Sequence, residues 1–400
     1  VNLHSLSMVP GWVFAGGRDV FLALSQMGVA AAQGLTGWLQ NGSLQRYLLL
    51  LVVLALAAGV SPFLGDGPSS QMASLHLNDL NWGVAVVGLL GIATTLATTC
   101  VHRQRLLALV LLGATGLTVC LTFAYFSAPD LALTQLLVEL ATVMLMMLAL
   151  HWLPAESTAS PHRIRAWRDA VIAIAVGLGV AALVWMVLTR PGQSISDYFL
   201  ATTLPLGGGA NAVNVIIVDY RGFDTLGEIT VLGISALILH ALLANFNTAP
   251  AALSGTDGHP LMLQLVARLV LPFTVLVAVF FYLRGHNLPG GGFIGGLVLA
   301  IGLLLQSVAH GQSWVAQRSS LDYRAWVGWG LVVAVLSGLA SWWFGAPFLT
   351  STYDYPWLPG IGGVPLASAS LFDAGVFLVV VGATMVMLMS IARLTRKAGH

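Results

Sequence analysis

Residues 133–150 read LTQLLVELATVMLMMLAL, an apolar run with one carboxylate, Glu139, near its middle. A helix needs about 20 apolar residues to cross the hydrocarbon core of a bilayer, so this stretch predicts a membrane-spanning helix. A charged side chain at the centre of such a helix costs on the order of 3 kcal/mol to insert. Glu139 therefore requires a structural or functional explanation.

The composition supports a membrane location for the whole chain. Of the 400 residues, 58% are hydrophobic and 8% are charged, whereas soluble domains have about 25% charged residues. So few charges cannot cover a surface that faces water, which favours an integral membrane protein. The formal net charge of +1 gives no indication of a nucleic-acid partner.

Ten stretches of the chain are long and apolar enough to be transmembrane helices. Lipid offers no hydrogen bonds to the backbone, so these stretches are expected to be helical and the fold class all-α. The predicted spans are 45–64, 82–101, 106–126, 131–153, 170–189, 225–245, 269–284, 293–310, 326–344 and 371–392.

The first 44 residues have a weaker pattern. They have helical tendency but are interrupted by glycines and by Arg18, Asp19, Gln26 and Gln33. This pattern predicts an amphipathic lateral segment along the membrane face. The alternative is a loosely packed span among partner helices.

The basic residues predict the orientation. With residue 45 on the cytoplasmic side, twelve basic residues fall inside and three fall outside, and this bias places the C-terminus in the cytoplasm. The inner set is Arg46, Arg103, Arg105, Arg163, Arg165, Arg168, Arg268, Arg318, Arg324, Arg393, Arg396 and Lys397, and the outer set is Arg190, Arg221 and Arg284.

Glu139 has polar neighbours at helical spacing. Gln135 lies four residues before it and Thr142 three residues after it, so the three side chains share one stripe of the helix. That stripe should face protein or water. It predicts a titrating site on an ion or proton path, because intramembrane carboxylates are usually functional. The alternative is a protonated Glu139 that donates a structural hydrogen bond.

Asp130 starts the same predicted helix, directly after Pro129. A carboxylate in the first turn complements the helix dipole, so a capping role is expected. An entrance to the polar stripe is the alternative.

A second acidic cluster lies in NAVNVIIVDYRGFDTLGEITVLG, residues 211–233. AVNVIIV is too short to cross a membrane and predicts a re-entrant or interfacial segment. Asp224 and Glu228, four residues apart, share a helix face that Ser235 extends. Together with Asp219 they suggest a cation-attracting vestibule at the outer side. A surface group of salt bridges with Arg221 is the alternative.

His240 lies near the cytoplasmic end of the same predicted span. A histidine at such a place is expected to make an interfacial hydrogen bond, and proton exchange with the cytoplasm is the alternative. No Cys/His spacing predicts a metal site, and no motif predicts a cofactor.

The glycine-rich stretch GHNLPGGGFIGG, residues 285–296, contains Gly290, Gly291, Gly292 and Gly295. It formally matches G-x-G-x-x-G, but both flanks are membrane spans, which excludes a dinucleotide site. A tight turn that allows two helices to pack closely is expected instead. Asp373, which begins the last predicted span, is expected to complement the dipole of its helix.

Three motifs occur in the order APDLALTQLLVE, NAVNVIIVDYRGFDTLGEITVLG and GHNLPGGGFIGG. Together they resemble the Mrp-type (multisubunit) Na+/H+ antiporters. The chain is similar to the C-terminal part of their large A-type protein followed by their small B-type protein. The resemblance implies four divisions. Residues 1–66 resemble the tail of the antiporter-like unit, with its lateral segment and anchoring span. Residues 67–153 form a three-span unit with Glu139, and residues 154–262 a two-span unit plus the re-entrant segment with Glu228. Residues 263–400 resemble the four-span B-type protein.

The resemblance implies a bacterial inner-membrane complex of several membrane subunits that exchanges cytoplasmic Na+ for external H+. It also implies that Glu139 and Glu228 are functional. Asp130, Asp219, Arg221 and Asp224 match motif positions whose roles the resemblance leaves open. Nothing in this sequence matches the large channel-bearing domain of the A-type protein, which lies either in another chain or outside residues 1–400, and Lys397 is the single lysine. We therefore expect that this chain alone is not a complete antiporter. A membrane subunit of a complex I-like or membrane-bound hydrogenase complex is the alternative function.

Overall fold

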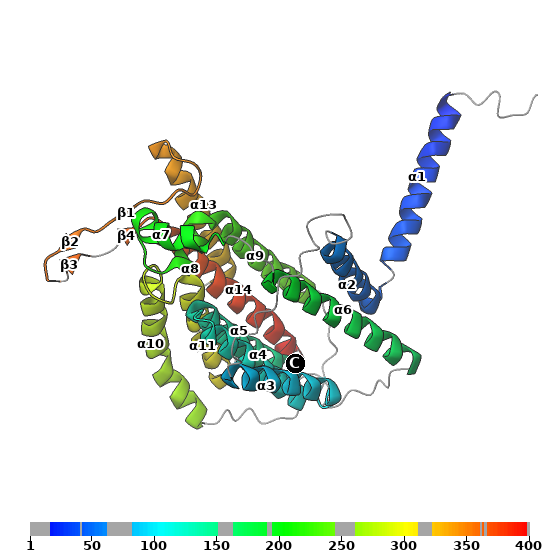
Figure 1. Ribbon diagram of the computed structural model, residues 1–400, viewed down its shortest axis with the longest axis horizontal. Coiled ribbons are helices and arrows are strands. Elements are labelled where there is room, and N and C mark those ends of the chain that lie inside the picture. Colours follow the sequence, from blue (N-terminus) through cyan, green and yellow to red (C-terminus); the bar gives the residue numbers. More distant parts are fainter. Residues whose placement is uncertain are drawn as a thin grey trace, which may run out of the picture. The chain divides into compact units, whose positions relative to one another are not determined.

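The computed structural model describes residues 17–40, 42–61, 82–150, 163–189, 194–244, 261–310, 322–360, 362–363 and 366–397. The predicted linker at 247–260 and the predicted divisions at 66/67 and 153/154 lie outside these ranges. Figure 1 shows that the described part is mostly helix.

The helices follow the apolar runs of the sequence. They are α1 (Gly17–Leu39), α2 (Leu44–Val60), α3 (Trp82–Cys100), α4 (Arg105–Tyr125), α5 (Pro129–Leu150), α6 (Arg163–Thr189), α7 (Ser196–Gly207), α8 (Ala212–Val215), the π-helix η4 (Ile216–Tyr220), α9 (Gly222–Ala244), α10 (Leu261–Arg284), α11 (Gly292–His310), α13 (Tyr323–Ala340), the 3-10 helix η5 (Ser341–Phe344) and α14 (Ala369–Lys397).

Ten helices among the described residues are long and apolar enough to cross a membrane. The all-α integral membrane fold with about ten spans is therefore confirmed. The largest difference in an expected boundary is in α10, which begins at Leu261, eight residues before the predicted span. Pro272 lies inside that helix, and membrane helices tolerate such prolines.

The N-terminal pair of helices differs in detail from the expected assignment. α1 contains Val20–Leu39, which is long and apolar enough to span, although the sequence predicts a lateral segment there. α2, which the sequence predicts to span, has 17 residues. Glycines and glutamines interrupt the apolar run of α1 without ending the helix, and they give it the lowest mean hydropathy of the ten candidate spans.

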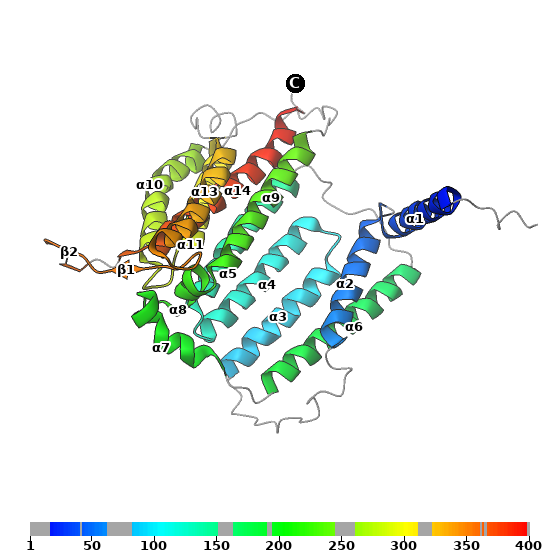
Figure 2. The same ribbon diagram turned by 90° about the horizontal axis from the view of Figure 1, so that it is seen from above.

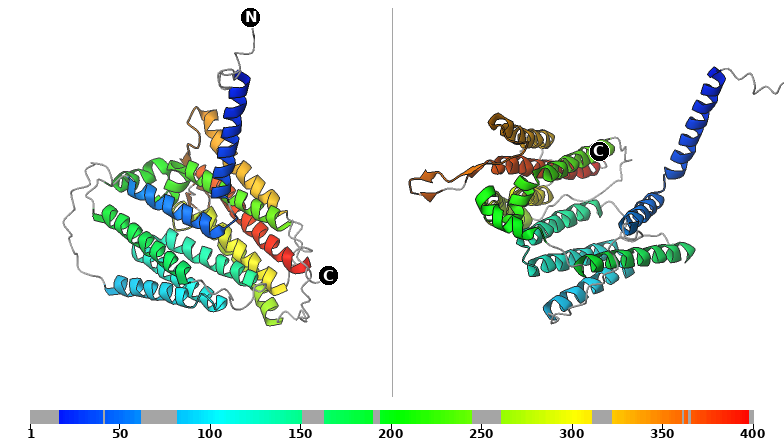
Figure 3. Two further views of the ribbon diagram at one scale, coloured as in Figure 1. Left: turned by 90° about the vertical axis from the view of Figure 1, so that its right-hand side faces the viewer. Right: turned by 45° about the horizontal axis from the view of Figure 1, so that its top comes forward.

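The chain forms two compact units. One contains α1, α2 and α6, and the other contains α3–α5 and α7–α14. In the first unit α2 lies beside α6 (Figure 3), with Gly59 against Leu183 and Gly179 against Leu56. The units therefore divide the chain differently from the four divisions implied by the resemblance, since α6 separates from α7–α9.

The core of the larger unit is built around α11 and α14. These are the two most buried spans, and their buried residues pack with α9, α13 and part of α5. Small residues allow the close approach. The backbones of Gly330 and Gly375 lie against each other where α13 crosses α14, and Gly382 lies against the carbonyl of Tyr323. Close packing of this kind is typical of membrane helices.

Three consecutive helices extend from this core. α3 packs on α4, α4 packs on α5, and α5 packs on α11 and α14. Figure 2 shows α3, α4 and α5 as a row of neighbouring helices. Within this row, Glu139 of α5 lies against α4.

The segment before α9 is bent. α7 and the α8–η4 pair meet at 81°, and neither part is long enough to cross a membrane alone. Asn211 caps α8 by accepting hydrogen bonds from the backbone N–H groups of Val213 and Asn214. Gly208, with a φ of +68°, ends α7 in the left-handed conformation.

Short strands connect η5 to α14. β1 (Tyr353–Asp354) pairs with β4 (Leu366–Ala367), and β2 (Trp357–Leu358) pairs with β3 (Gly362–Gly363), both antiparallel. The side-chain hydroxyls of Tyr353 and Tyr355 donate to the carbonyls of Pro205 and Gly208. This hairpin is thereby attached to the bent α7–α8 segment.

Candidate functional site

Glu139 lies at the midpoint of α5, as the eleventh of its 22 residues. Its side chain is half-buried and lies against α4, where Gly116 leaves room for it. Neither a hydrogen bond nor an ion pair joins Glu139 to another residue in the described ranges. The carboxylate is therefore held by packing rather than by a polar partner of the described chain.

The residues of the expected polar stripe differ in burial. Gln135 is half-buried like Glu139, whereas Thr142 is exposed. Hydroxyls gather instead on the facing helices, where Thr115 of α4 donates to Thr94 of α3 at 3.0 Å. The described helices therefore cover the stripe in part at Gln135 and Glu139 and leave it exposed at Thr142.

Asp130 is buried, and its carboxylate accepts a hydrogen bond from a residue outside its own helix. It lies in the first turn of α5, as expected. Its Oδ1 accepts a hydrogen bond from the backbone N–H of Gly290 at 2.9 Å. Sequence reasoning treats Asp130 as a cap and misses this long-range bond, since nothing in the motif points to residue 290.

Asp373 makes the equivalent contact from α14. It is the fifth residue of that helix, beyond the first turn in which the sequence places it. Its Oδ2 accepts from the N–H of Gly292 at 2.6 Å, and the residue is 7% exposed. Two buried carboxylates from different helices therefore hold amides two residues apart in one loop.

The loop between α10 and α11 owes its shape to its glycines. Gly291 has a φ of +108°, and a Cβ there would lie 2.7 Å from the Asn214 amide nitrogen and 3.2 Å from the Asp373 carboxylate. A Cβ at Gly295 would lie 2.7 Å from the carbonyl oxygen of Ala278. Gly290, Gly291, Gly292 and Gly295 thus form a turn in which α10 and α11 pack closely.

The loop is also tied to the bent segment before α9. The Asn211 amide donates to the carbonyls of Gly285 and Leu288 at 3.0 and 3.1 Å. His286 is buried, and its Nε2 lies 2.9 Å from the carbonyl oxygen of Gly207. Asn211 and Asn214 are structural residues that sequence reasoning did not single out, although their NAVN spacing is that of a helix cap.

The acidic face of α9 is exposed. Asp224, Glu228 and Ser235 all lie on it. Arg221 forms an ion pair with Asp224, as the salt-bridge alternative expects. Glu228 has neither a hydrogen bond nor an ion pair within the described part of the chain.

Asp219 lines a cavity of about 450 Å³ on the larger unit. Its carboxylate accepts from the backbone N–H of Ser351 at 3.4 Å. Tyr220 also lines the cavity, and its buried hydroxyl has no hydrogen-bond partner in the described structure. The cavity lies between the bent segment and the loop after η5, and Arg221 of the Arg221–Asp224 ion pair is one of its lining residues.

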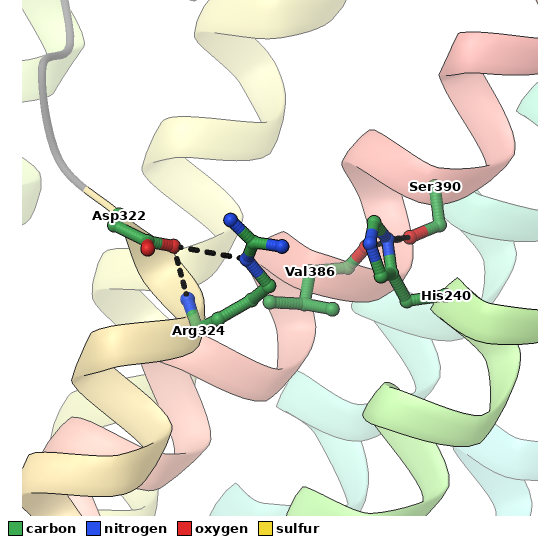
Figure 4. Close-up of polar contacts among 5 residues, drawn as sticks. All are labelled: His240, Asp322, Arg324, Val386 and Ser390. Carbon is green, nitrogen blue, oxygen red and sulfur yellow. Dashed lines mark hydrogen bonds and ion pairs between the residues drawn. The ribbon is translucent and has the colours of Figure 1, made fainter. Parts of the chain in front are cut away.

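His240 lies on α9 away from the acidic face and bonds to α14. Its Nδ1 lies 3.0 Å from the hydroxyl of Ser390, which in turn donates to the carbonyl of Val386 at 2.6 Å. Figure 4 shows this contact beside the start of α13, where Asp322 accepts from the backbone and side chain of Arg324. The interfacial hydrogen-bond interpretation describes this geometry.

Glu139 and Glu228 do not meet. Glu139 lies against α4, and Glu228 lies on the exposed face of α9. The helices that carry these residues, α5 and α9, both contact α14. In the described part of the chain, groups of three or more His, Cys, Asp or Glu that could hold a metal ion are absent. The acids are therefore distributed along the bundle.

About ten candidate spans, two of which carry a carboxylate without a hydrogen-bond partner among the described residues, define an integral membrane protein with several spans as the class of protein. Three family models match successive parts of the chain. They are MbhD at residues 90–155 and MbhE at 164–259, both described as subunits of MBH, and MnhB, described as a "Domain related to MnhB subunit of Na+/H+ antiporter", at 262–386.

Similar proteins agree with this class. A probable K+/H+ antiporter protein of Rhizobium meliloti (strain 1021), named as the combined A/B subunit, is 42% identical over 89% of this chain and 38% of its own length. The B-type subunit of the Na+/H+ antiporter of Bacillus subtilis (strain 168) is 43% identical over 33% of this chain and 93% of its own length. A chain of the Mrp complex from Dietzia sp. DQ12-45-1b has 30% identity and a TM-score of 0.76, over 94% of this chain and 42% of that one.

The chain belongs to the family of Mrp-type multisubunit antiporter proteins, and it joins a part of the A-type protein to the B-type protein. Members of this family are transporter subunits rather than enzymes. The chain spans 38% of the length of the Rhizobium relative.

Proposed function

We propose that this chain is a membrane subunit of a multisubunit antiporter that exchanges cytoplasmic Na+ for external H+ across a bacterial plasma membrane. Its partners are the other membrane subunits of the same complex, within the lipid bilayer. Glu139 is the observation on which the proposal depends, because it is a carboxylate at mid-span without a hydrogen-bond partner in the described chain. An intramembrane acid in that state is suited to gain and lose protons.

Glu228 has the complementary role in this proposal. It is an exposed carboxylate on a membrane span, which is costly against lipid. We infer that a partner subunit or a water-lined path covers this face of α9. Asp224 and the cavity at Asp219 attract cations from the outer side, while Asp130, Gln135, Thr142 and His240 line or support the path.

The orientation follows from the basic residues. The twelve-to-three bias of arginine and lysine supports a cytoplasmic C-terminus. The three matched segments, 90–155, 164–259 and 262–386, support the divisions at 67–153, 154–262 and 263–400. We infer from the resemblance that residues 1–66 are the tail of the antiporter-like unit.

Vesicles that contain the whole complex test the proposal. Glu139→Ala should abolish Na+-dependent proton flux, while Asp354→Asn, which changes an exposed acid of the β1 strand, should leave it unchanged. Wild-type flux in the Glu139→Ala complex would contradict the proposal.

K+ is a second candidate for the transported cation, because the Rhizobium relative is named as part of a probable K+/H+ antiporter. Proton flux in the same vesicles, driven in turn by Na+ and by K+ at equal ionic strength, separates the two. A flux that responds to K+ and not to Na+ would replace Na+ in the proposal.

A second function has its own observation. Two of the three matched family models describe MBH subunits, which favours a membrane subunit of a complex I-like or hydrogenase-like assembly. Purification of the native complex tests it. Iron–sulfur or flavin subunits among the co-purified chains would favour this alternative, and small membrane subunits alone would favour the antiporter.

A further inference from the structure

Two glycines of α4, one turn apart, face the Glu139 side chain. A Cβ added at Gly116 would overlap three Glu139 atoms, namely Oε2, Cδ and Cγ. At Gly113 the nearest atoms to such a Cβ are Val143 Cγ2 at 3.6 Å and Glu139 Oε1 at 3.7 Å, which is ordinary van der Waals contact. The carboxylate therefore lies directly on the backbone of α4 at Gly116.

A side chain at position 116 would move Glu139 as a whole. The overlap includes Cγ, so rotating the carboxyl group alone cannot relieve it. The Glu139 side chain would need a different χ1 rotamer, which points it away from α4. Because Glu139 has no hydrogen-bond partner in the described chain, nothing else on the described helices holds the carboxylate where it now lies.

Glycine at this position also has a cost that calls for a reason. Glycine weakens a helix interior relative to alanine, and Gly116 is buried inside α4. The close approach of Glu139 supplies that reason.

We propose that Gly116 is a positioning residue for Glu139. The bare backbone of α4 forms a socket that holds the Glu139 carboxylate at its place on the ion path. The inference rests on the proposed function of Glu139, and it adds a determinant on a second helix.

Flux measurements with two matched glycine variants test the socket. In vesicles with the whole complex, Gly116→Ala should lower Na+-dependent proton flux at least about tenfold, since small displacements of an acting group cost large factors in rate. Gly113→Ala, on the same helix and face, should remain close to wild type. Wild-type flux in Gly116→Ala, or an equal loss in Gly113→Ala, would overturn the socket.

A shorter acid should rescue the variant. Glu139→Asp removes one methylene and withdraws the carboxylate from position 116. The double variant Gly116→Ala/Glu139→Asp should therefore transport more than the product of the two single effects. Independent, multiplicative effects would contradict the proposal.

The pH profile of the flux should also shift in Gly116→Ala and not in Gly113→Ala. A lower rate with an unchanged profile would indicate a merely structural glycine.

Thermal unfolding of the complex separates the socket from the transport role. Gly116→Ala should lower Tm when Glu139 is present and raise it in a Glu139→Ala background, where the overlap is gone and alanine favours the helix. The same Tm change in both backgrounds would overturn the socket. If Glu139→Ala transports normally while the Tm changes still reverse, the transport role of Glu139 fails and the contact stands.

Discussion

The Asp130 carboxylate accepts a hydrogen bond from the Gly290 backbone N–H at 2.9 Å, across 160 positions of sequence. It joins the first turn of α5 to the loop between α10 and α11. Asp373 of α14 holds Gly292 of the same loop at 2.6 Å. These two bonds connect the helix that carries Glu139 to the α11–α14 core.

Removing the Asp130 carboxylate should destabilise the bundle. Asp130→Ala leaves the N–H of Gly290 without its acceptor in a buried place, which costs about 1–3 kcal/mol. Asp130→Asn keeps an acceptor oxygen and should lose less. The measurement is Tm of the purified complex for both variants. An unchanged Tm in Asp130→Ala would show that water or another acceptor takes the place of the carboxylate.

The glycine at 291 should be more sensitive than a glycine whose φ is also positive but which has free space around its Cβ position. Gly291 (φ +108°) packs against Asn214 and Asp373, whereas Gly345 (φ +71°) has no atom within 4 Å of its Cβ position. Gly345→Ala bears backbone strain alone, on the order of 1 kcal/mol. Gly291→Ala adds steric overlap with the two side chains, so its Tm should fall further. Equal Tm losses would assign the whole effect to backbone strain.

The apolar runs predict most of the fold because each span must satisfy its own backbone in lipid. The predicted 82–101 and 293–310 agree closely with Trp82–Cys100 and Gly292–His310. The helix pair at the N-terminus is harder to predict, since Val20–Leu39 is near the limit of hydropathy and Leu44–Val60, with 17 residues, is near the limit of length. There the choice between lateral and spanning depends on surrounding chains.

The site is predicted less completely than the fold. Glu139 and Glu228 stand out because carboxylates are rare in apolar runs. The partners of Asp130 and Asp373 do not, since both acids bind backbone amides that carry no side-chain signal. The role of Gly116 cannot be predicted from the sequence either, because a glycine among small residues gives no indication of the side chain that packs on it.

Asp322 should give the start of α13 a measurable pH dependence. Hydrogen bonds from the side chain and backbone of Arg324 hold the pKa of the exposed Asp322 carboxylate below its usual value. The carboxylate therefore stabilises the helix start above the unfolded pKa, about 4, and the contribution disappears as pH falls through the lower folded pKa.

Comparison of Asp322→Ala with wild type tests this dependence. The Tm difference between the two complexes should be present at neutral pH and should vanish in acid. A difference that persists at pH values well below the folded pKa would mean that Asp322 acts by packing rather than by charge. Asp354→Asn, at an exposed acid remote from α13 in sequence, serves as the control for general acid effects.

Glu228 and Asp224 should respond differently to loss of charge, although both lie on the exposed face of α9. Asp224 is already paired with Arg221, and both side chains are at least half exposed, so Asp224→Asn should change stability by about 0–1 kcal/mol. As one of several groups that attract cations, it should lower flux less than Glu228→Gln does. Glu228 has no partner in the described chain, so its charge is available to a passing cation or proton.

Glu228→Gln should abolish Na+-dependent proton flux in vesicles with the whole complex while Tm stays near wild type. Equal flux in the two variants would place Glu228 in the surface salt-bridge group, and a large fall of Tm in Glu228→Gln would make its role one of assembly.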